Sequence, residues 1–252
     1  MNGRCRVCSD RYYFNYAWKC SNVSGLCQKY NPNNGDCTSC YAGYVLDDGG
    51  RGILSNIIHL SAGGYCSFFL KNNKTVLACG RNDKGQLGIG NMTDIKGDNN
   101  TFITNVLLDG VNLTNVVFIE ALGDQTLFLT SEGKVLICGQ ISMPSFIGDN
   151  KDVSSYNFYN NPRYVKRIAG EDLTNVVQIS SNGNSYLFLQ TDGKVLAYGN
   201  NDYSKLGTGD SQIIKTYPKY VMKTKDEFLS NIKQVDISLV SLFLETSGKV
   251  LR

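Results

Sequence analysis

Short apolar segments alternate with polar turns along most of the chain, and the same order of segments recurs four times. One motif is a hydroxyl residue, an asparagine and then a mainly β-branched run. Its copies are Ser55–Leu60, Thr114–Ile119, Thr174–Ile179 and Ser230–Val235, spaced 59, 60 and 56 residues apart. Because both the order and the spacing are kept, the chain contains an internal repeat of short strands.

A hairpin motif keeps the same period. Each copy has an apolar strand, a polar turn and a second strand that begins with valine and leucine: Leu70–Leu77, Leu129–Leu136, Leu189–Leu196 and Leu244–Leu251. Gly133, Gly193 and Gly248 end the turn in three copies, where a tight hairpin requires positive φ. A short Tyr-Val strand follows, and we expect the hydroxyl-asparagine strand to close each unit. Four short strands in roughly 55–60 residues are typical of a propeller blade. The predicted fold is therefore all-β: about four β-propeller repeats, two of them half-units at the ends.

The two predicted half-units allow three arrangements, which the sequence leaves open. The chain is a fragment of a longer propeller, or the halves close within one chain, or the front half of one molecule adds strands to the back half of the next. The last arrangement gives a ring or a filament. The strands that would make this contact contain Tyr44, Val45, Ile57, Ile58, Leu242, Leu244, Val250 and Leu251.

Cysteine usage divides the chain near Gly43 into a cysteine-rich module (1–43) and the propeller-repeat domain (44–252). Six of nine cysteines lie in the module: Cys5, Cys8, Cys20, Cys27, Cys37 and Cys40. Clustered cysteines in a short segment predict three disulfides. A zinc site is the alternative to disulfides, although a site with four thiolate ligands would not use Cys20 and Cys27. Cys66 and Cys79 flank one hairpin and are expected to form a further, cross-strand disulfide. Cys138 is then left without a cysteine to pair with, and a buried thiol is the commoner state of such a cysteine.

Charge and isolated motifs narrow the function classes. A net charge of +3 is too small to indicate nucleic acid, and no apolar run approaches a membrane span. His59 is the only histidine, so a catalytic triad or metal site is not expected, and its strand position indicates a structural slot. Gly80 and Gly85 have the spacing of a phosphate loop, but Gln86 and Leu87 follow where Lys-Ser/Thr is needed. We therefore predict a non-enzymatic protein without a cofactor, whose partner is another protein.

N-linked glycosylation is expected if the chain is secreted. Asn73 and Asn91, in polar turns, are the most accessible candidates. The five sequons are Asn22, Asn73, Asn91, Asn99 and Asn112. Chance alone gives roughly four in a chain with this many asparagines and hydroxyl residues, so the placement of the sequons is more informative than their number.

Two resemblances follow from these motifs. Cys79–Gly90, and Gly193–Asn201 with Lys205–Gly209, resemble the repeats of the regulator-of-chromosome-condensation family of seven-bladed propellers, over about residues 44–252. That resemblance implies a propeller fold and, in the family, a nuclear guanine-nucleotide-exchange role. Cys37–Tyr44 resembles the ends of furin-like and growth-factor-receptor-like cysteine-rich repeats, which implies an extracellular or lumenal address.

The cysteine-rich module decides between the function hypotheses, because a cytosolic propeller would not keep six clustered cysteines unless they bound metal. We predict an extracellular or cell-surface structural or adhesive glycoprotein, as a filament subunit that assembles head to tail. One alternative is an intracellular exchange-factor-like or chromatin-associated propeller. A soluble secreted binding protein is the other.

Overall fold

A computed structural model describes residues 27–30, 37–40, 44–46, 52–95, 103–141, 147, 157–211 and 213–252. These residues form antiparallel sheets and one short 3-10 turn, η3 (Asp202–Ser204), without an α-helix. No helix in this described part is long and apolar enough to cross a membrane. The all-β propeller-repeat fold predicted from the sequence is confirmed.

Four sheets form successive blades in chain order. Blades 1 to 3 each have four strands and blade 4 has three within the described residues. Their strands are β5 (Ile57–Gly63), β6 (Cys66–Lys71), β7 (Val76–Gly80) and β8 (Thr104–Asn105); β11 (Val116–Leu122), β12 (Gln125–Thr130), β13 (Val135–Ile141) and β14 (Asn157–Tyr164); β17 (Val176–Ser181), β18 (Ser185–Gln190), β19 (Val195–Gly199) and β20 (Ile214–Tyr220); and β23 (Ile232–Ile237), β24 (Ser241–Glu245) and β25 (Val250–Leu251).

Two-stranded hairpins link the blades. The hairpins that follow blades 1, 2 and 3 are β9 (Leu107–Leu108) with β10 (Val111–Asn112), β15 (Lys166–Ile168) with β16 (Glu171–Asp172), and β21 (Met222–Thr224) with β22 (Glu227–Phe228). Before blade 1, β3 (Tyr44–Leu46) pairs with β4 (Gly52–Leu54), and β1 (Cys27–Tyr30) pairs with β2 (Cys37–Cys40).

The hydroxyl-asparagine strand opens each blade instead of closing it, which corrects the expected order. It is β5, β11, β17 or β23, and it pairs with the hairpin that follows it in the chain. Asn56, Asn115, Asn175 and Asn231 all have φ near +60°, a conformation that asparagine tolerates better than most residues. In this conformation their carbonyls accept the amide hydrogen of the next hairpin turn, for example Asn72 N–H to Asn56 O at 2.8 Å. The repeated asparagine therefore ties each opening strand to its own blade.

Turn glycines are explained by contact with the following blade. Gly133 has φ +70°, and a Cβ there would lie 2.9 Å from the backbone N of Val176 in blade 3. In turn, Val176 N–H donates to Gly133 O at 3.0 Å. Gly193 contacts Asn231 of blade 4 in the same way. Close backbone approach at positive φ favours glycine here, although Lys74 takes the same conformation in blade 1 (φ +65°) and accepts Val116 N–H at 3.1 Å.

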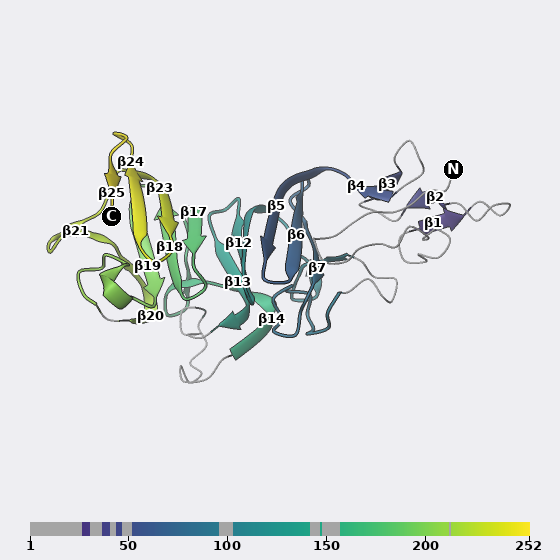
Figure 1. Ribbon diagram of the computed structural model, residues 1–252, viewed down its shortest axis with the longest axis horizontal. Helices are drawn as coiled ribbons and strands as arrows, with labels where there is room; N and C mark the ends of the chain where they lie inside the picture. Colours follow the sequence, from purple (N-terminus) through teal and green to yellow (C-terminus); the bar gives the residue numbers. More distant parts are fainter. Residues whose placement is uncertain are drawn as a thin grey trace.

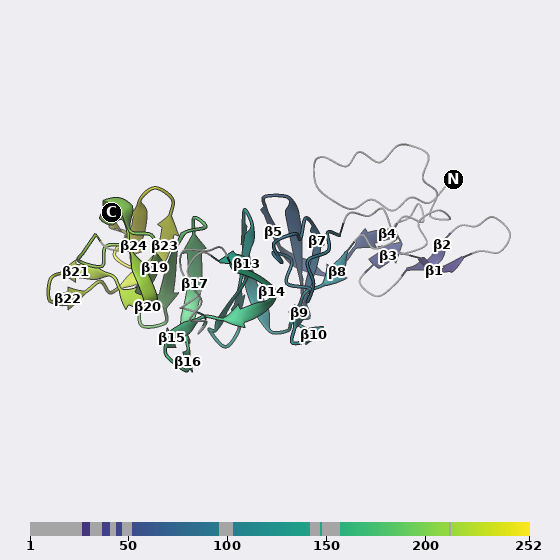
Figure 2. The same ribbon diagram turned by 90° about the horizontal axis from the view of Figure 1, so that it is seen from below.

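The blades stand side by side in an open row (Figures 1 and 2), with blade 1 and blade 4 at its two ends. Closure of the two ends within one chain, one of the three arrangements that the sequence left open, is not what the structure shows. Blade 4 holds three strands and not the predicted half-unit of two, because β23 belongs to it. At the other end the Tyr44-Val45 strand, β3, pairs in a hairpin with β4.

The hydrophobic core lies between neighbouring blades. Phe68, Leu70, Val76 and Ala78 of blade 1 pack in one cluster with Ile119, Ala121, Phe128 and Leu136 of blade 2. A second cluster joins blades 2, 3 and 4 by equivalent residues. Each sheet is therefore apolar on both faces where it has two neighbours, which explains the continuous apolar runs of the second and third strands.

The predicted Cys66–Cys79 disulfide is wrong. Cys66 pairs with Gly80 across the hairpin and Cys79 pairs with Ser67, so the two side chains point to opposite faces of the sheet. Cys66, Cys79 and Cys138 are buried and outside any disulfide. Burial raises the pKa of the Cys66 thiol to about 12, and it also raises that of Cys138. Cys138 is the buried thiol expected from the sequence, and such thiols are unreactive.

The predicted disulfides of the cysteine-rich module stay predictions. Cys5, Cys8 and Cys20 lie outside the described residues. Cys27 pairs in register with Cys40, and Tyr30 with Cys37, in the β1–β2 hairpin. This backbone register does not choose between disulfides and zinc.

Candidate protein-binding face

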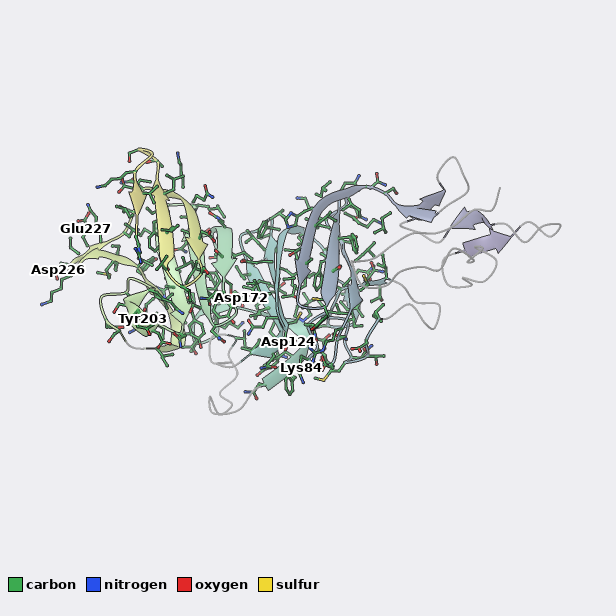
Figure 3. The ribbon with its side chains drawn as sticks, viewed as in Figure 1. Lys84, Asp124, Asp172, Tyr203, Asp226 and Glu227 are labelled. Carbon is green, nitrogen blue, oxygen red and sulfur yellow. The ribbon has the colours of Figure 1, made fainter. Side chains whose placement is uncertain are left out.

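Turns and loops of the blades gather at one end of the sheets. In blades 1 and 3 the turn between the first and second strands and the loop after the third strand lie at the same end, as antiparallel order requires. Backbone hydrogen bonds join the two: Arg81 N–H to Tyr65 O in blade 1, and Gln140 N–H to Asp124 O in blade 2. We call this end the loop face. Lys84, Asp124 and Tyr203 lie along it at the lower edge of Figure 3.

One buried asparagine organises the loop after the third strand. The Asn82 amide donates to Asn91 O at 2.8 Å and to Thr93 O at 3.2 Å, and its oxygen accepts Leu87 N–H at 2.9 Å. In blade 3, Asn201 repeats the arrangement: its amide donates to Asp210 O and its oxygen accepts Leu206 N–H. Both asparagines are fully buried. The buried asparagine therefore holds the loop in shape. In blade 1, exposed Asp83 and half-buried Lys84 lie on the surface of this loop.

Asn82→Ala is expected to lower the free energy of unfolding by about 2–4 kcal/mol, because it leaves Leu87 N–H and two buried carbonyls without their partner. Asn201→Ala should cost a similar amount in blade 3. The exposed Asn184, replaced by alanine, is the control and should change little. Urea denaturation measures all three. An Asn82 variant as stable as the Asn184 variant would contradict this role.

The loop of blade 1 is also fixed to blade 2. Asn160, on β14, accepts Gly90 N–H through its backbone oxygen at 2.9 Å and donates its side-chain amide to Gly90 O at 3.0 Å. Thr126 Oγ1 donates to Gln86 O at 2.9 Å. A Cβ on Gly85 would lie 2.7 Å from Cα of Asn160. These contacts hold the blade 1 loop against blade 2, which lowers the entropic cost of binding a partner there.

Charged and aromatic groups cover this rigid frame. Arg81 pairs with Asp83 at 2.7 Å and with Asp124 of the next blade at 3.5 Å. The hydrogen bond from Arg81 holds the pKa of Asp83 below its usual value, so this carboxylate stays ionised. Tyr203 is 99% exposed and has φ +61°. Exposed ion pairs contribute little to stability, so these groups are available for recognition.

The Gly80–Gly85 segment does not form a phosphate cradle, because its amides bond within the protein. Asn82 N–H donates to the Asp94 carboxylate at 2.7 Å, Lys84 N–H to Gln86 Oε1 at 2.9 Å and Gly85 N–H to Asn82 O at 2.9 Å. The interpretation as a blade loop is confirmed.

The innermost strands carry polar side chains that join one blade to the next. His59 bonds through Nε2 to Ile119 O at 3.0 Å and its ring contacts Phe118, so its predicted structural role is confirmed. Glu120 is the unusual member. One of its oxygens accepts Ser181 N–H at 3.0 Å, and the other is buried without a hydrogen-bond partner. Burial, and to a smaller extent the charge of Asp236, raise the pKa of Glu120 to about 7.

Of the five predicted glycosylation sites, Asn73, Asn91 and Asn112 are exposed, whereas Asn22 and Asn99 lie outside the described residues. Asn73 accepts from Thr75, and Asn91 from Thr93, in local turns. The sequence analysis missed the anchors Asn82 and Asn201, although an asparagine occupies this same loop position in two of the repeats. It also missed Glu120, for which no local signal exists.

Comparisons with known proteins identify the repeats. The family model for the regulator of chromosome condensation (RCC1) repeat matches residues 57–86. The chain carries RCC1-type propeller repeats. It is 33% identical over 166 residues to Protein pim1 of Schizosaccharomyces pombe, covering 63% of this chain and 30% of pim1. It is also 28% identical over 154 residues to human HERC4, a probable E3 ubiquitin-protein ligase, covering 61% of this chain and 13% of HERC4.

Two solved structures are similar to this chain in fold. Human WBSCR16 matches with a TM-score of 0.58 and 22% identity, over 77% of this chain and 46% of that one. Yeast RCC1 (Prp20), solved with Kap60, matches with a TM-score of 0.53 and 20% identity, over 79% and 45%. The chain therefore spans less than a third of the curated relatives and less than half of these structures.

The RCC1-type relatives contradict the extracellular location predicted from the cysteine-rich module. One of them, HERC4, is a probable E3 ubiquitin-protein ligase, a class of enzyme that acts inside cells. The extracellular prediction depended on a cysteine pattern of about forty residues, whereas the RCC1-type match to pim1 covers 63% of the chain. The adhesive and glycoprotein interpretations, which need that location, lose their basis with it.

Proposed function

We propose that the chain is a non-enzymatic, intracellular protein-binding propeller of the exchange-factor-like kind, with the loop face as its binding surface. This is the first of the two alternatives considered from the sequence. The observation that carries it is the match to pim1 over 166 residues, 63% of this chain.

The form of the loop face supports a protein partner. Its loops are anchored through Asn82 and Asn201, and its exposed groups are arginine, tyrosine and charged side chains, the types found at interface hot spots. The best-formed hollow in the described part of the chain has about 130 Å³ and is lined by residues such as Leu108, Glu132 and Tyr164. Small-molecule sites usually have about 300 Å³ or more, so a flat protein contact fits better.

The partner class that we propose is a Gsp1p-type guanine-nucleotide-binding protein. Prp20p, a structural neighbour, was characterised with Gsp1p and with histones. Histones are strongly basic, and this chain has a net charge of +3, so long-range electrostatics do not favour them. The RCC1-type resemblance implies guanine-nucleotide exchange, which agrees with the first partner.

Lys84→Ala and Tyr203→Ala are each expected to weaken binding of the full chain to a purified Gsp1p-type protein about tenfold. The Lys84 side chain lies over the Phe158 ring and near Asp83, and Tyr203 is solvent-exposed, so neither change should unfold the chain. Biolayer interferometry measures the affinity, and release of a fluorescent guanine nucleotide measures exchange.

Asp226→Ala and Glu227→Ala are the matched controls. Both residues are exposed on the β21–β22 hairpin, which follows the fourth strand and lies away from the loop face (Figure 3). They should leave binding unchanged. Equal losses in all four variants, or no binding at about 100 μM, would contradict the proposal.

A further inference from the structure

A hollow of about 130 Å³ lies between blades 1 and 2, at the end of the sheets opposite the loop face. The β9–β10 hairpin, the β12–β13 turn and the end of β14 form its walls, which include Leu108, Val111, Thr130, Glu132 and Tyr164. We call it the hairpin hollow. The connections from β7 to β8 and from β13 to β14, which contain undescribed residues, join their strands at the loop-face end, so the walls consist of described residues only.

The next junction, between blades 2 and 3, repeats the elements of this hollow. The β9–β10 and β15–β16 hairpins both lie along the lower edge of the row of blades in Figure 2. In each hairpin a leucine amide donates to a valine carbonyl, Val106 O in the first and Val165 O in the second. The second residue after this valine is Leu108 in the first hairpin and Arg167 in the second. Leu108 and Arg167 therefore occupy equivalent positions.

Arg167 lies against a tyrosine of the following blade. Its guanidinium carbon is 5.2 Å from the centre of the Tyr220 ring, and its Nη1 donates to Pro218 O at 3.3 Å. Tyr220 pairs with the third strand of blade 3 as Tyr164 pairs with that of blade 2, so the two tyrosines are equivalent. Lys194 is 6.0 Å from the same Tyr220 ring. The tyrosine at this junction therefore carries two cations.

A second long side chain reaches across the junction between blades 2 and 3. The Gln190 amide donates to Thr174 O at 3.3 Å. Thr130 stands at the equivalent position of blade 2, since Thr130 and Gln190 end the second strand in the same register. Leu108 in place of Arg167 and Thr130 in place of Gln190 are both shorter, and these two differences account for the hairpin hollow.

The hairpin hollow keeps the groups that receive a cation. Lys134 lies 5.2 Å from the Tyr164 ring, as Lys194 does from its tyrosine, but Lys134 does not line the hollow. The place of the second cation is therefore open. Glu132, an exposed carboxylate, lines it, and Leu108 and Val111 supply an apolar wall. An aromatic ring, a carboxylate and an apolar wall suit a cation on a long aliphatic stem.

We propose that the hairpin hollow binds the side chain of an arginine on a partner protein, in the way that Arg167 lies against Tyr220 at the next junction. The guanidinium stacks on Tyr164 and pairs with Glu132, and its methylene groups lie on the apolar wall. Arginine fits better than lysine because its planar guanidinium stacks on aromatic rings. The hollow has room for one side chain and not for the backbone, so the arginine belongs to a segment that runs over the surface. The loop face is not involved, so this site is independent of the proposed function.

The test is an NMR titration of the full, isotope-labelled chain with N-acetyl-arginine methylamide. Binding is expected with a dissociation constant on the order of millimolar, because one exposed cation–π contact and one surface ion pair are individually weak. Amide shifts should be confined to the β9–β10 hairpin and the β12–β13 turn. The citrulline analogue has the same shape without the charge and should bind at least about tenfold more weakly. The lysine analogue should also bind more weakly.

Variants of the chain test the wall groups one at a time. Leu108→Arg fills the hollow from within and should abolish binding of the arginine probe. Glu132→Gln should weaken binding about threefold to fivefold. Asp226→Asn removes a charge from the exposed β21–β22 turn and is the control, which should bind like the unmodified chain. Circular dichroism and thermal unfolding check that each variant is folded.

The reciprocal variant combines Arg167→Leu with Gln190→Thr and should open a second site, with new shifts in the β15–β16 hairpin. A double variant that is folded and gains no site would overturn the equivalence on which the proposal rests. No shift with about 50 mM of the arginine probe, equal binding of the citrulline or lysine analogue, or unchanged binding in Leu108→Arg would each overturn the proposal.

Discussion

Replacing Gly139 by alanine is expected to destabilise the chain by about 3–5 kcal/mol, the sum of backbone strain and overpacking. Gly139 ends the β12–β13 pairing with φ +98°, and a Cβ there would lie 2.1 Å from Asp124 O and 3.0 Å from Cα of Gln125. Both contacts are to backbone atoms, so no side-chain rotation relieves them. Gly80 and Gly199 hold the equivalent position in blades 1 and 3, with a Cβ at 2.2 Å from a carbonyl oxygen.

Gly110→Ala is the control that separates the cost of backbone strain from the cost of overpacking. Gly110 has φ +85°, but nothing lies within 4 Å of its Cβ position, so its cost should be about 1–2 kcal/mol of conformational strain alone. Urea denaturation of the two variants and the unmodified chain gives both values. If Gly139→Ala costs no more than Gly110→Ala, the tight approach between the third strand and the preceding turn is not a constraint on this fold.

Replacing Glu120 by glutamine is expected to stabilise the chain at pH 8 by up to about 3 kcal/mol. The pKa of Glu120 is about 7 in the folded chain, against an ordinary value of 4.5. Between these two pH values the folded state binds more protons than the unfolded state, so stability falls as pH rises. Glutamine keeps the neutral form and preserves an oxygen for Ser181 N–H, so it removes this loss.

The comparison is made by urea denaturation at pH 5 and pH 8. The variant and the unmodified chain should differ little at pH 5 and diverge at pH 8. Glu132→Gln removes the same charge from an exposed hairpin turn and should change stability by less than about 0.5 kcal/mol at both pH values. Parallel pH profiles for the Glu120 variant and the unmodified chain would show that this carboxyl is solvated in the folded state.

The candidate binding face could be predicted only in part from the sequence. The loop signature around Asn82 was recognised as a propeller feature, but its role as an anchor depends on carbonyls nine and eleven residues away, Asn91 and Thr93. The location was predicted wrongly, because cysteine spacing in residues 1–43 was given more weight than the repeats. A short cysteine pattern records local chemistry and is a weaker indication of the compartment than a match over 63% of the chain.

The sequence by itself determined the features that depend on neighbouring residues: the all-β class, the four repeats, the positive-φ asparagines and glycines, and the structural position of His59. These are local because turn geometry and strand alternation act over a few residues. Tertiary structure decided what depends on the partner of each strand. Pairing of β5 with β6 made the hydroxyl-asparagine strand the opening strand of its blade. The register of β6 against β7, which pairs Cys66 with Gly80 and Ser67 with Cys79, put the two thiols on opposite faces of the sheet. Stacking of one blade on the next buried Glu120, since burial is set by which surfaces meet.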